Sequence, residues 1–231
     1  MPSPLYVETR VAASLDALWS HSQDPALHSR WDLRFSSITP CGIDERGHQR
    51  FRYATRLLPF LTVSGDGVNT GERHRPDGGC TSALRFASGH PLSLIATGSG
   101  YWRYQPASDA VRFLTGYDYR PRWGVVGRVL DALVVRPLMG WATAWSFDRL
   151  RIWLETGVTP ERSRNRGLAE VVLRLALVGL AATLHPALAL LALPAALLVP
   201  PTRTSPAARR CRRRPSRPVR APRIADSLES R

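Results

Sequence analysis

The residue types best suited to catalysis or metal binding are scattered through this sequence. The six histidines include no pair four residues apart, and Cys41, Cys80 and Cys211 lie far from one another without CxxC spacing. That distribution predicts neither a disulfide framework nor a zinc site. The HExxH, GxSxG and glycine-rich phosphate-loop motifs do not occur. We therefore expect no metal and no cofactor.

Four polar residues on segments of strand-like sequence are candidates for contacting a ligand. They are Tyr53, Thr55, Tyr117 and Asp118. Side-chain alternation along a strand favours an inward direction for the first three and an outward direction for Asp118. Their spacing assembles no acid, base or nucleophile, and ordinary hydrogen-bonded sheet residues are the simpler interpretation. No reaction is predicted from them.

The elements that must position these residues follow from periodicity and turn chemistry. Alternation predicts a strand at residues 6–11, and Ser14 is placed to cap a short helix that stops near Pro25. A second short helix over "ALHSRWD" follows. Turn-forming sequences then separate six more predicted strands, at residues 35–43, 49–57, 61–70, 80–87, 94–104 and 110–119.

The pattern changes to helical after the last strand. Between Val125 and Glu155 apolar residues recur at spacings of three and four, which indicates one long amphipathic helix. Pro137 should kink or divide it, because proline removes a backbone donor. Gly157 and Pro160 should end it, and they mark the domain boundary. The apolar positions are Val126, Val129, Leu130, Leu133, Val134, Leu138, Trp141 and Trp145.

This order of elements resembles the SRPBCC (START-like, polyketide cyclase and lipid-transport) superfamily. The resemblance covers residues 3 to about 157 and includes "LDALWSHSQDPALHSRWD", with Trp31 and Asp32, after the first strand. It implies an α+β helix-grip fold, in which a curved antiparallel sheet of about seven strands wraps a long C-terminal helix and encloses a hydrophobic cavity. The expected cavity residues are Tyr53, Thr55, Trp102, Tyr104, Phe113, Thr115, Tyr117, Trp141 and Trp145.

Aromatic walls of this kind favour rigid or lipid-like ligands. The function expected first is therefore binding of a hydrophobic small molecule such as a lipid or polyketide. Plain core packing explains the same aromatic residues equally well. A cyclase or aromatase acting in the same cavity is the enzymatic alternative, and a non-catalytic interaction module is the third.

The longest apolar run lies beyond the predicted domain. Residues 175–199 carry no charge over 25 positions, and a helix of that length reaches about 37 Å, against a hydrocarbon thickness of about 30 Å. Pro186 and Pro194 interrupt the run, so a kinked single span and a hairpin turning at His185–Pro186 are both open. We expect a transmembrane or membrane-inserted segment at residues 168–201, joined to the domain 1–157 by a linker at 158–167.

Charge is concentrated at the same end of the chain. Residues 1–160 hold 18 arginines and 14 acidic residues, whereas residues 161–231 hold 14 and four. The basic tail favours a cytoplasmic C-terminal side by the positive-inside rule, and the N-terminus lacks a signal-peptide pattern, which predicts a cytoplasmic domain as well. Both expectations are satisfied if the apolar run enters and leaves the membrane on the same, cytoplasmic face.

The arginine- and proline-rich segment 202–231 is expected to be disordered. Its arginines would be attracted to anionic lipid headgroups by about 1 kcal/mol each. A solvated tail without a partner is the next interpretation. Nucleic acid ranks last, because the sequence contains no motif of a known nucleic-acid reader.

Overall fold

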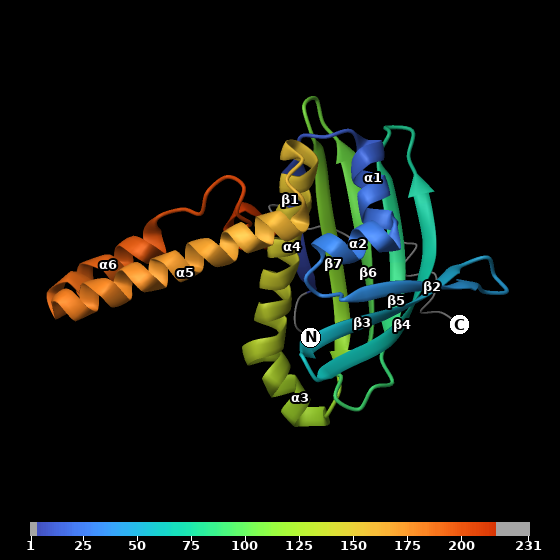
Figure 1. The fold of residues 1–231 in the computed structure, drawn as a ribbon. Helices are drawn as coiled ribbons and strands as arrows, with labels where there is room; N and C mark the ends of the chain where they lie inside the picture. Colours follow the sequence, from blue (N-terminus) through green and yellow to red (C-terminus); the bar gives the residue numbers. More distant parts are fainter. Residues whose placement is uncertain (1–3, 216–231) are drawn as a thin grey trace.

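A seven-stranded antiparallel sheet forms the body of the protein in the computed structural model, which describes residues 4–215 (Figure 1). The strand order is β1-β7-β6-β5-β4-β3-β2, so the first strand pairs with the last and the rest form a meander. The seven strands predicted from alternation are all present, within a few residues at their ends. Their bounds are β1 Leu5–Val11, β2 Ser37–Ile43, β3 Gln49–Leu58, β4 Leu61–His74, β5 Cys80–Ala87, β6 Ile95–Pro106 and β7 Val111–Pro121.

Two short helices, α1 (Leu15–Gln23) and α2 (Pro25–Trp31), follow β1. The Ser14 side chain caps α1 as predicted, accepting a hydrogen bond from the Ala17 amide. Asp24 ends α1 and caps α2, where its Oδ1 lies 2.7 Å from the Ala26 amide nitrogen. Pro25 therefore begins a helix as well as following one, because the first helical position needs no amide donor.

The long C-terminal helix of the domain is divided where the proline predicted a break. Helix α3 (Gly124–Leu130) runs into a π-helical turn, η1 (Asp131–Val135), and then into α4 (Arg136–Thr156). Pro137 stands in the first turn of α4, where its missing amide is tolerated. Gly157 ends α4 with a φ of 69°, a left-handed conformation that glycine adopts without steric cost.

The core lies between the sheet and α4, closed at one end by α1 and α2. Phe113 of β7 stacks between Tyr104 of β6 and Phe147 of α4, with ring centroids 5.0 and 4.4 Å away. Trp31 and Trp102 pack beside them, and all five side chains are buried. Burial of this much aromatic surface is the main stabilising contribution at this end of the grip.

Beyond α4, the chain forms a hairpin of two helices that projects away from the domain (Figure 1). Helix α5 (Pro160–Leu184) and helix α6 (Pro186–Leu198) meet at His185, whose extended backbone breaks the helix. The predicted linker at residues 158–167 contains the start of α5, from Pro160 onward. Thr159 caps α5, and Ser163 of its first turns is fully buried against the domain.

The first half of the predicted disordered tail is ordered, which corrects that prediction for residues 202–215. Ala207, Ala208 and Cys211 are buried against α4. Arg212 exchanges backbone hydrogen bonds of 2.8 and 2.9 Å with Glu8 of β1. Composition misled here because a few small side chains and backbone groups suffice to dock an arginine-rich segment. The rest of the predicted tail, 216–231, lies outside the described residues.

Candidate functional site: the inner face of the helix grip

Aromatic rings lie flat on the inner face of the sheet because glycines stand opposite them. Tyr53 of β3 pairs with Gly65 of β4, and Phe86 of β5 pairs with Gly98 of β6. A Cβ atom at either glycine would overlap the paired ring. The same arrangement joins Phe51 and Gly67. These rings form an aromatic floor over β3 to β6, away from the tightly packed end of the core.

A buried polar cluster stands beside this floor, at the end of α2. The Asp32 carboxylate is fully buried and accepts hydrogen bonds from Arg34 Nε at 2.9 Å and Nη2 at 2.6 Å. His28, one helical turn earlier, places Nε2 3.0 Å from Asp32 Oδ2. The guanidinium of Arg34 in turn lies over the rings of Phe35 and Tyr117, 5.4 Å from each centroid.

Burial and charge set the protonation states of this cluster. Burial lowers the pKa of His28 below 6.5, and the Asp32 carboxylate opposes this only in part, so the imidazole is neutral and donates its Nε2 proton. Burial alone would raise the pKa of Asp32, but the Arg34 charge and hydrogen bonds outweigh it and hold that pKa well below its usual range. Asp32 and Arg34 therefore form an ion pair between an ionised carboxylate and a guanidinium.

Tyr117 and Thr55 border the cluster, as their predicted inward directions require. The Tyr117 hydroxyl lies 2.8 Å from Thr143 Oγ1 of α4 and is buried. Burial raises the pKa of Tyr117 against the opposing charge of Arg34. Thr55 Oγ1 donates to the Arg34 carbonyl at 2.5 Å. Both hydroxyls therefore serve the packing of α2 and α4 on the sheet as well as facing inward.

Four other predicted cavity residues belong to the packed core. Trp102 and Phe113 are in the aromatic stack, and the Thr115 hydroxyl donates to the Tyr101 carbonyl at 2.9 Å. The Tyr104 hydroxyl lies 2.6 Å from Ser22 Oγ and accepts from Gln23 at 2.9 Å. These contacts show core packing, which was the alternative interpretation of the aromatic residues, at the end of the sheet covered by α1 and α2.

Trp141 and Trp145 lie elsewhere on α4. Their rings stack on each other with centroids 6.1 Å apart, and Trp141 is 41% exposed. Trp145 is partly buried and lies under the Arg149 guanidinium, 5.0 Å from its centroid. The residues of α4 that are buried in this region are Gly140, Thr143 and Phe147, and Trp141 is not among them.

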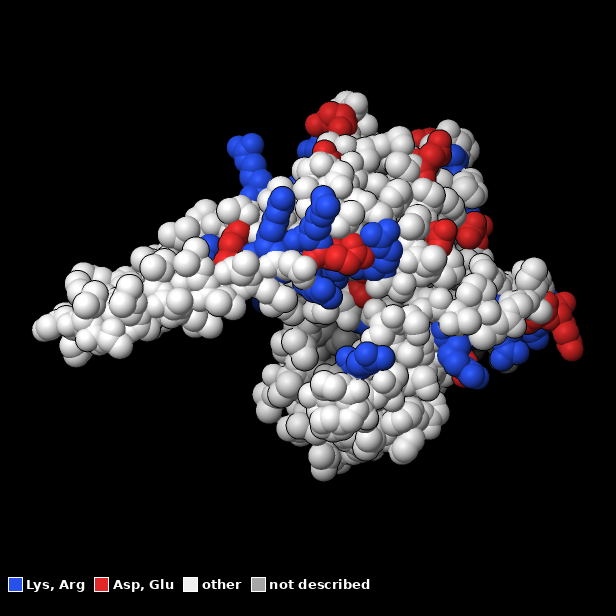
Figure 2. Space-filling model, viewed as in Figure 1, with Lys and Arg blue, Asp and Glu red and all other residues white. Residues whose placement is uncertain are grey.

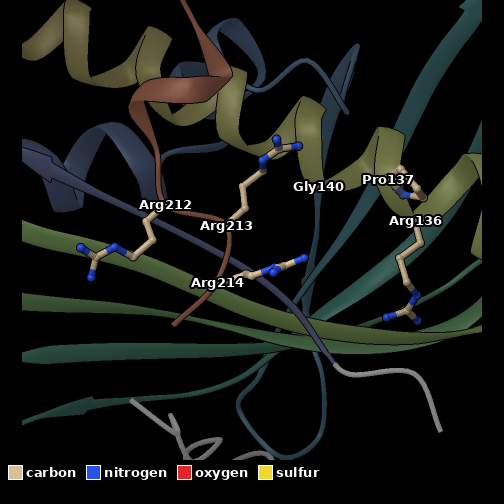
Figure 3. A pocket seen from close by; sticks show the side chains of 6 residues that line it. All are labelled: Arg136, Pro137, Gly140, Arg212, Arg213 and Arg214. Atoms are coloured by element: carbon tan, nitrogen blue, oxygen red, sulfur yellow. The ribbon is translucent and has the colours of Figure 1, made fainter. Parts of the chain in front are cut away.

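Two hollows in the described chain lie away from the aromatic floor. One is an open groove of about 590 Å³ between the start of α4 and residues 202–215, called the returning segment below; it is lined by Arg136, Pro137, Gly140 and Arg212 to Arg214 (Figure 3). The other, of about 180 Å³, is polar and lies at the ends of β4 to β6, with Cys80, Arg103 and Tyr104 in its lining. The described residues include no group of three or more metal-ligating side chains.

Sequence reasoning did not select His28, Asp32 and Arg34 as site residues. A signal was present, since His28 and Asp32 stand four residues apart and so share a helix face. The pairing of Asp32 with Arg34 carried no such signal, because the two lie beyond the end of α2 in an irregular segment. Chemically, the cluster and the floor together offer ring faces for apolar groups and a fixed polar edge at Arg34 and Tyr117.

A curved antiparallel sheet that holds a long C-terminal helix, with two short helices after the first strand, is a helix-grip fold, the fold implied by the resemblance to the SRPBCC/START-like superfamily. No protein-family model matches the sequence. The chain is 48% identical over 160 residues to an uncharacterized membrane protein of Bacillus subtilis (strain 168), YndG. The match covers 69% of this chain and 60% of that protein, so the chain spans about three fifths of its relative.

Solved structures similar to this chain include a STAR-related lipid transfer protein from Xanthomonas axonopodis and the Zhui aromatase/cyclase from Streptomyces sp. R1128. The first has a TM-score of 0.48 at 18% identity and covers 64% of this chain and 82% of its own. The second has a TM-score of 0.45 at 16% identity and covers 64% and 95%. At these identities the likeness concerns the fold alone.

Proposed function

We propose that this protein binds a hydrophobic small molecule on the inner face of its helix grip while the α5–α6 hairpin anchors it to a membrane. The observation that carries the proposal is the hairpin itself. Its helices are covered with leucine, valine and alanine and are almost entirely unburied beyond the first turns of α5. By length and composition α5 is able to cross a bilayer. Such a surface is unfavourable in water and favourable in lipid.

The hairpin closes on itself at the level of Arg174. The Arg174 guanidinium donates to the carbonyls of Ala196 and Val199, each at 2.8 Å, and so satisfies groups left free at the end of α6. Glu170, one turn earlier, accepts from Ser205 Oγ at 2.6 Å. Residues 170–174 and 196–205 therefore form a polar clasp at the hairpin base.

The length beyond the clasp fits one leaflet. The ten residues 175–184 of α5 extend about 15 Å at 1.5 Å per residue, and the 13 residues of α6 about 20 Å. Half of the hydrocarbon core is about 15 Å thick. A hairpin of this size enters and leaves by the same face, which keeps the domain and residues 202–215 on one side. We place that side in the cytoplasm, as the arginine distribution favours.

The membrane part is tested by replacing residues 175–198 with a short glycine-serine linker. The clasp brings the two ends together, and the returning segment that packs on α4 is retained, which simple truncation after Thr159 would remove. An alkaline wash is expected to release the variant from membranes, whereas the full chain should remain in the membrane pellet. Equal solubility of both proteins without detergent would contradict the anchor.

The ligand part is tested by solvent extraction of the purified full chain followed by mass spectrometry. Tyr53→Ala removes a ring of the aromatic floor and is expected to lower the recovered ligand. Tyr101→Ala is the matched control, because Tyr101 also lies over a glycine, Gly116, but belongs to the opposite face of the sheet. Recovery of no co-purifying molecule from the full chain would count against binding.

A cyclase or aromatase-like enzyme acting on the same inner face is the second candidate. The buried contact between Tyr117 and Thr143, beside Arg34, is the observation in its favour, since it holds a hydroxyl in one orientation. Tyr117→Phe and Thr55→Val should abolish turnover of an identified ligand and leave its binding largely intact. Full activity in both variants would argue against catalysis.

A further inference from the structure

The outer surface of α3, η1 and the start of α4 is a second large apolar face. The exposed fractions of its side chains reach 73% at Leu133, 64% at Val126 and 56% at Leu138. Periodicity had indicated an amphipathic helix, and these apolar positions are turned away from the sheet. The face, called the α3–α4 face below, consists of Val125, Val126, Val129, Leu130, Leu133, Val134, Leu138 and Trp141.

The charged side chains of this segment are mostly turned inward. Asp131 is buried, accepts from the Tyr119 hydroxyl at 2.5 Å and pairs with Arg136 at 3.2 Å. Arg136 also reaches Asp118 at 3.0 Å. Within residues 123–141, all of which are described, Arg128 is the one charged residue on the exposed side. A solvated helix carries the opposite pattern, with its charges outside and its apolar stripe inside.

The hairpin and the α3–α4 face lie on the same side of the domain. Helix α4 has the sheet on one side, and α5 and α6 project crosswise from its far end, away from the sheet (Figure 1). The hairpin and the lower body of the molecule around α3 carry almost no charge, whereas arginines gather where the hairpin leaves the domain (Figure 2). These exposed arginines include Arg162, Arg164 and Arg166.

We propose that the α3–α4 face rests on the surface of the same lipid leaflet that the hairpin enters. The inference rests on the proposed membrane anchor. With the hairpin entering the leaflet obliquely, α3 and the start of α4 approach the bilayer, and their apolar side chains reach the boundary between headgroups and acyl chains. Arg162, Arg164 and Arg166, two to three helical turns before the clasp on α5, then face the headgroups, where anionic lipids attract them. The domain is thereby oriented by the membrane and does not swing on a tether.

Charge complementarity favours an anionic lipid surface over a second copy of this chain. The apolar face is bordered by arginines at the hairpin base, and the segment returning from the hairpin adds exposed Arg212, Arg213 and Arg214. A second copy of the chain would bring the same positive charges against these. An anionic bilayer neutralises them while it covers both apolar surfaces at once.

The experiment places an environment-sensitive nitrobenzoxadiazole label at single cysteines of the full chain reconstituted into phosphatidylcholine and phosphatidylglycerol vesicles. Cys41→Ser removes the exposed native thiol, while Cys80 and Cys211 are buried. Leu190→Cys reports on the hairpin and Val134→Cys on the α3–α4 face. Ser108→Cys is the control, in the exposed turn between β6 and β7. Vesicles with and without brominated acyl chains measure contact with lipid.

Blue-shifted emission and bromine quenching at both 190 and 134, with neither at 108, is the expected result. Quenching at 190 without quenching at 134 overturns the inference and leaves the anchor intact. A blue shift at 134 without bromine quenching, together with dimers by light scattering, overturns it in favour of a second copy. Absence of quenching at 190 contradicts the anchor and the inference together. Unfolding midpoints near that of the unlabelled chain confirm that each variant is folded.

Discussion

The buried carboxylate of Asp148, in the middle of α4, accepts a hydrogen bond of 2.8 Å from the backbone amide of Ala207. The two residues stand on either side of the whole apolar hairpin in the sequence. Arg210 Nη1 also reaches Asp148 Oδ2, at 3.0 Å, and Arg151 donates to Oδ1 at 2.8 Å. The helix that the sheet grips is therefore also the docking site of the segment that returns from the hairpin.

Asp148→Ala is expected to destabilise the folded protein by about 2–3 kcal/mol, because it leaves the buried Ala207 amide without an acceptor and removes one acceptor from each of Arg151 and Arg210. Denaturant unfolding in a mild detergent measures the change. Asp109→Asn is the control, since the Asp109 and Arg10 side chains pair at the surface, 73% and 65% exposed. Its cost should stay within about 1 kcal/mol. A small effect at Asp148 would mean that the returning segment contributes little.

Thiol reactivity provides a separate measure of the returning segment. Cys41 is exposed and should be alkylated rapidly in the folded protein. Burial raises the pKa of Cys211 to about 12, and its thiol donates to the Ala144 carbonyl, so its alkylation at pH 8 should be slow until denaturant is added. Replacement of residues 175–198 by a linker should leave this protection in place. Rapid labelling of Cys211 in the native full chain would contradict the docked position.

The glycines under the aromatic floor should not tolerate a methyl group. Gly65→Ala is expected to cost about 1–3 kcal/mol, because its Cβ would overlap the Tyr53 ring and the Ala87 carbonyl. Gly89→Ala is the matched control, since nothing lies within 4 Å of a Cβ at that position. Thermal unfolding of both variants decides the matter. Equal melting temperatures would show that the ring moves aside freely.

Acidification should weaken the fold through His28. Because its pKa is lowered in the folded state and ordinary in the unfolded state, the unfolded chain binds the proton first as the pH falls below about 6.5. The stability is thus fully present above about pH 6.5 and declines below it, towards the lowered folded-state pKa. His28→Gln keeps a donor for Asp32 but does not titrate, so the decline that begins below about pH 6.5 should flatten. An unchanged slope would remove His28 as its source.

Asp32 governs a second and more acidic window. Its folded-state pKa lies below the ordinary 3.8, so its contribution is present above about pH 3.8 and is lost as the pH falls further. This part of the acid transition should persist in His28→Gln, because the ion pair with Arg34 remains. The two variants His28→Gln and Asp32→Asn, followed by unfolding at several pH values, separate the two windows.

Local signals were sufficient for the elements themselves. Alternation located seven strands, the Ser14 cap and Gly157 bounded helices, and Pro137 marked the division between α3 and α4. These features depend on neighbours a few residues away, and such neighbours are visible in a sequence. The inward directions of Tyr117 and Phe113 followed for the same reason, because side chains on a strand alternate.

The site was less visible, because its members come from separate elements. Nothing in the spacing of Tyr53 and Gly65 shows that a ring lies on a glycine until β3 and β4 are set in register. Arg34 was not selected because its contact with the Tyr117 ring forms only once the segment after α2 lies beside β7. Trp141 was predicted to line the cavity because an apolar stripe indicates that one face of a helix is covered. The stripe does not indicate which surface covers it.

Composition, periodicity and capping by themselves determined the helix-grip order of elements and the presence of an uncharged segment suited to lipid. Tertiary structure alone decided that this segment folds back at His185, that residues 202–215 dock on α4, and that the stripe from Val125 to Trp141 faces outward. The physical reason is common to all three. Hydrophobic periodicity reports how much of a surface must leave water, whereas the identity of the surface that covers it depends on contacts between residues distant in the chain.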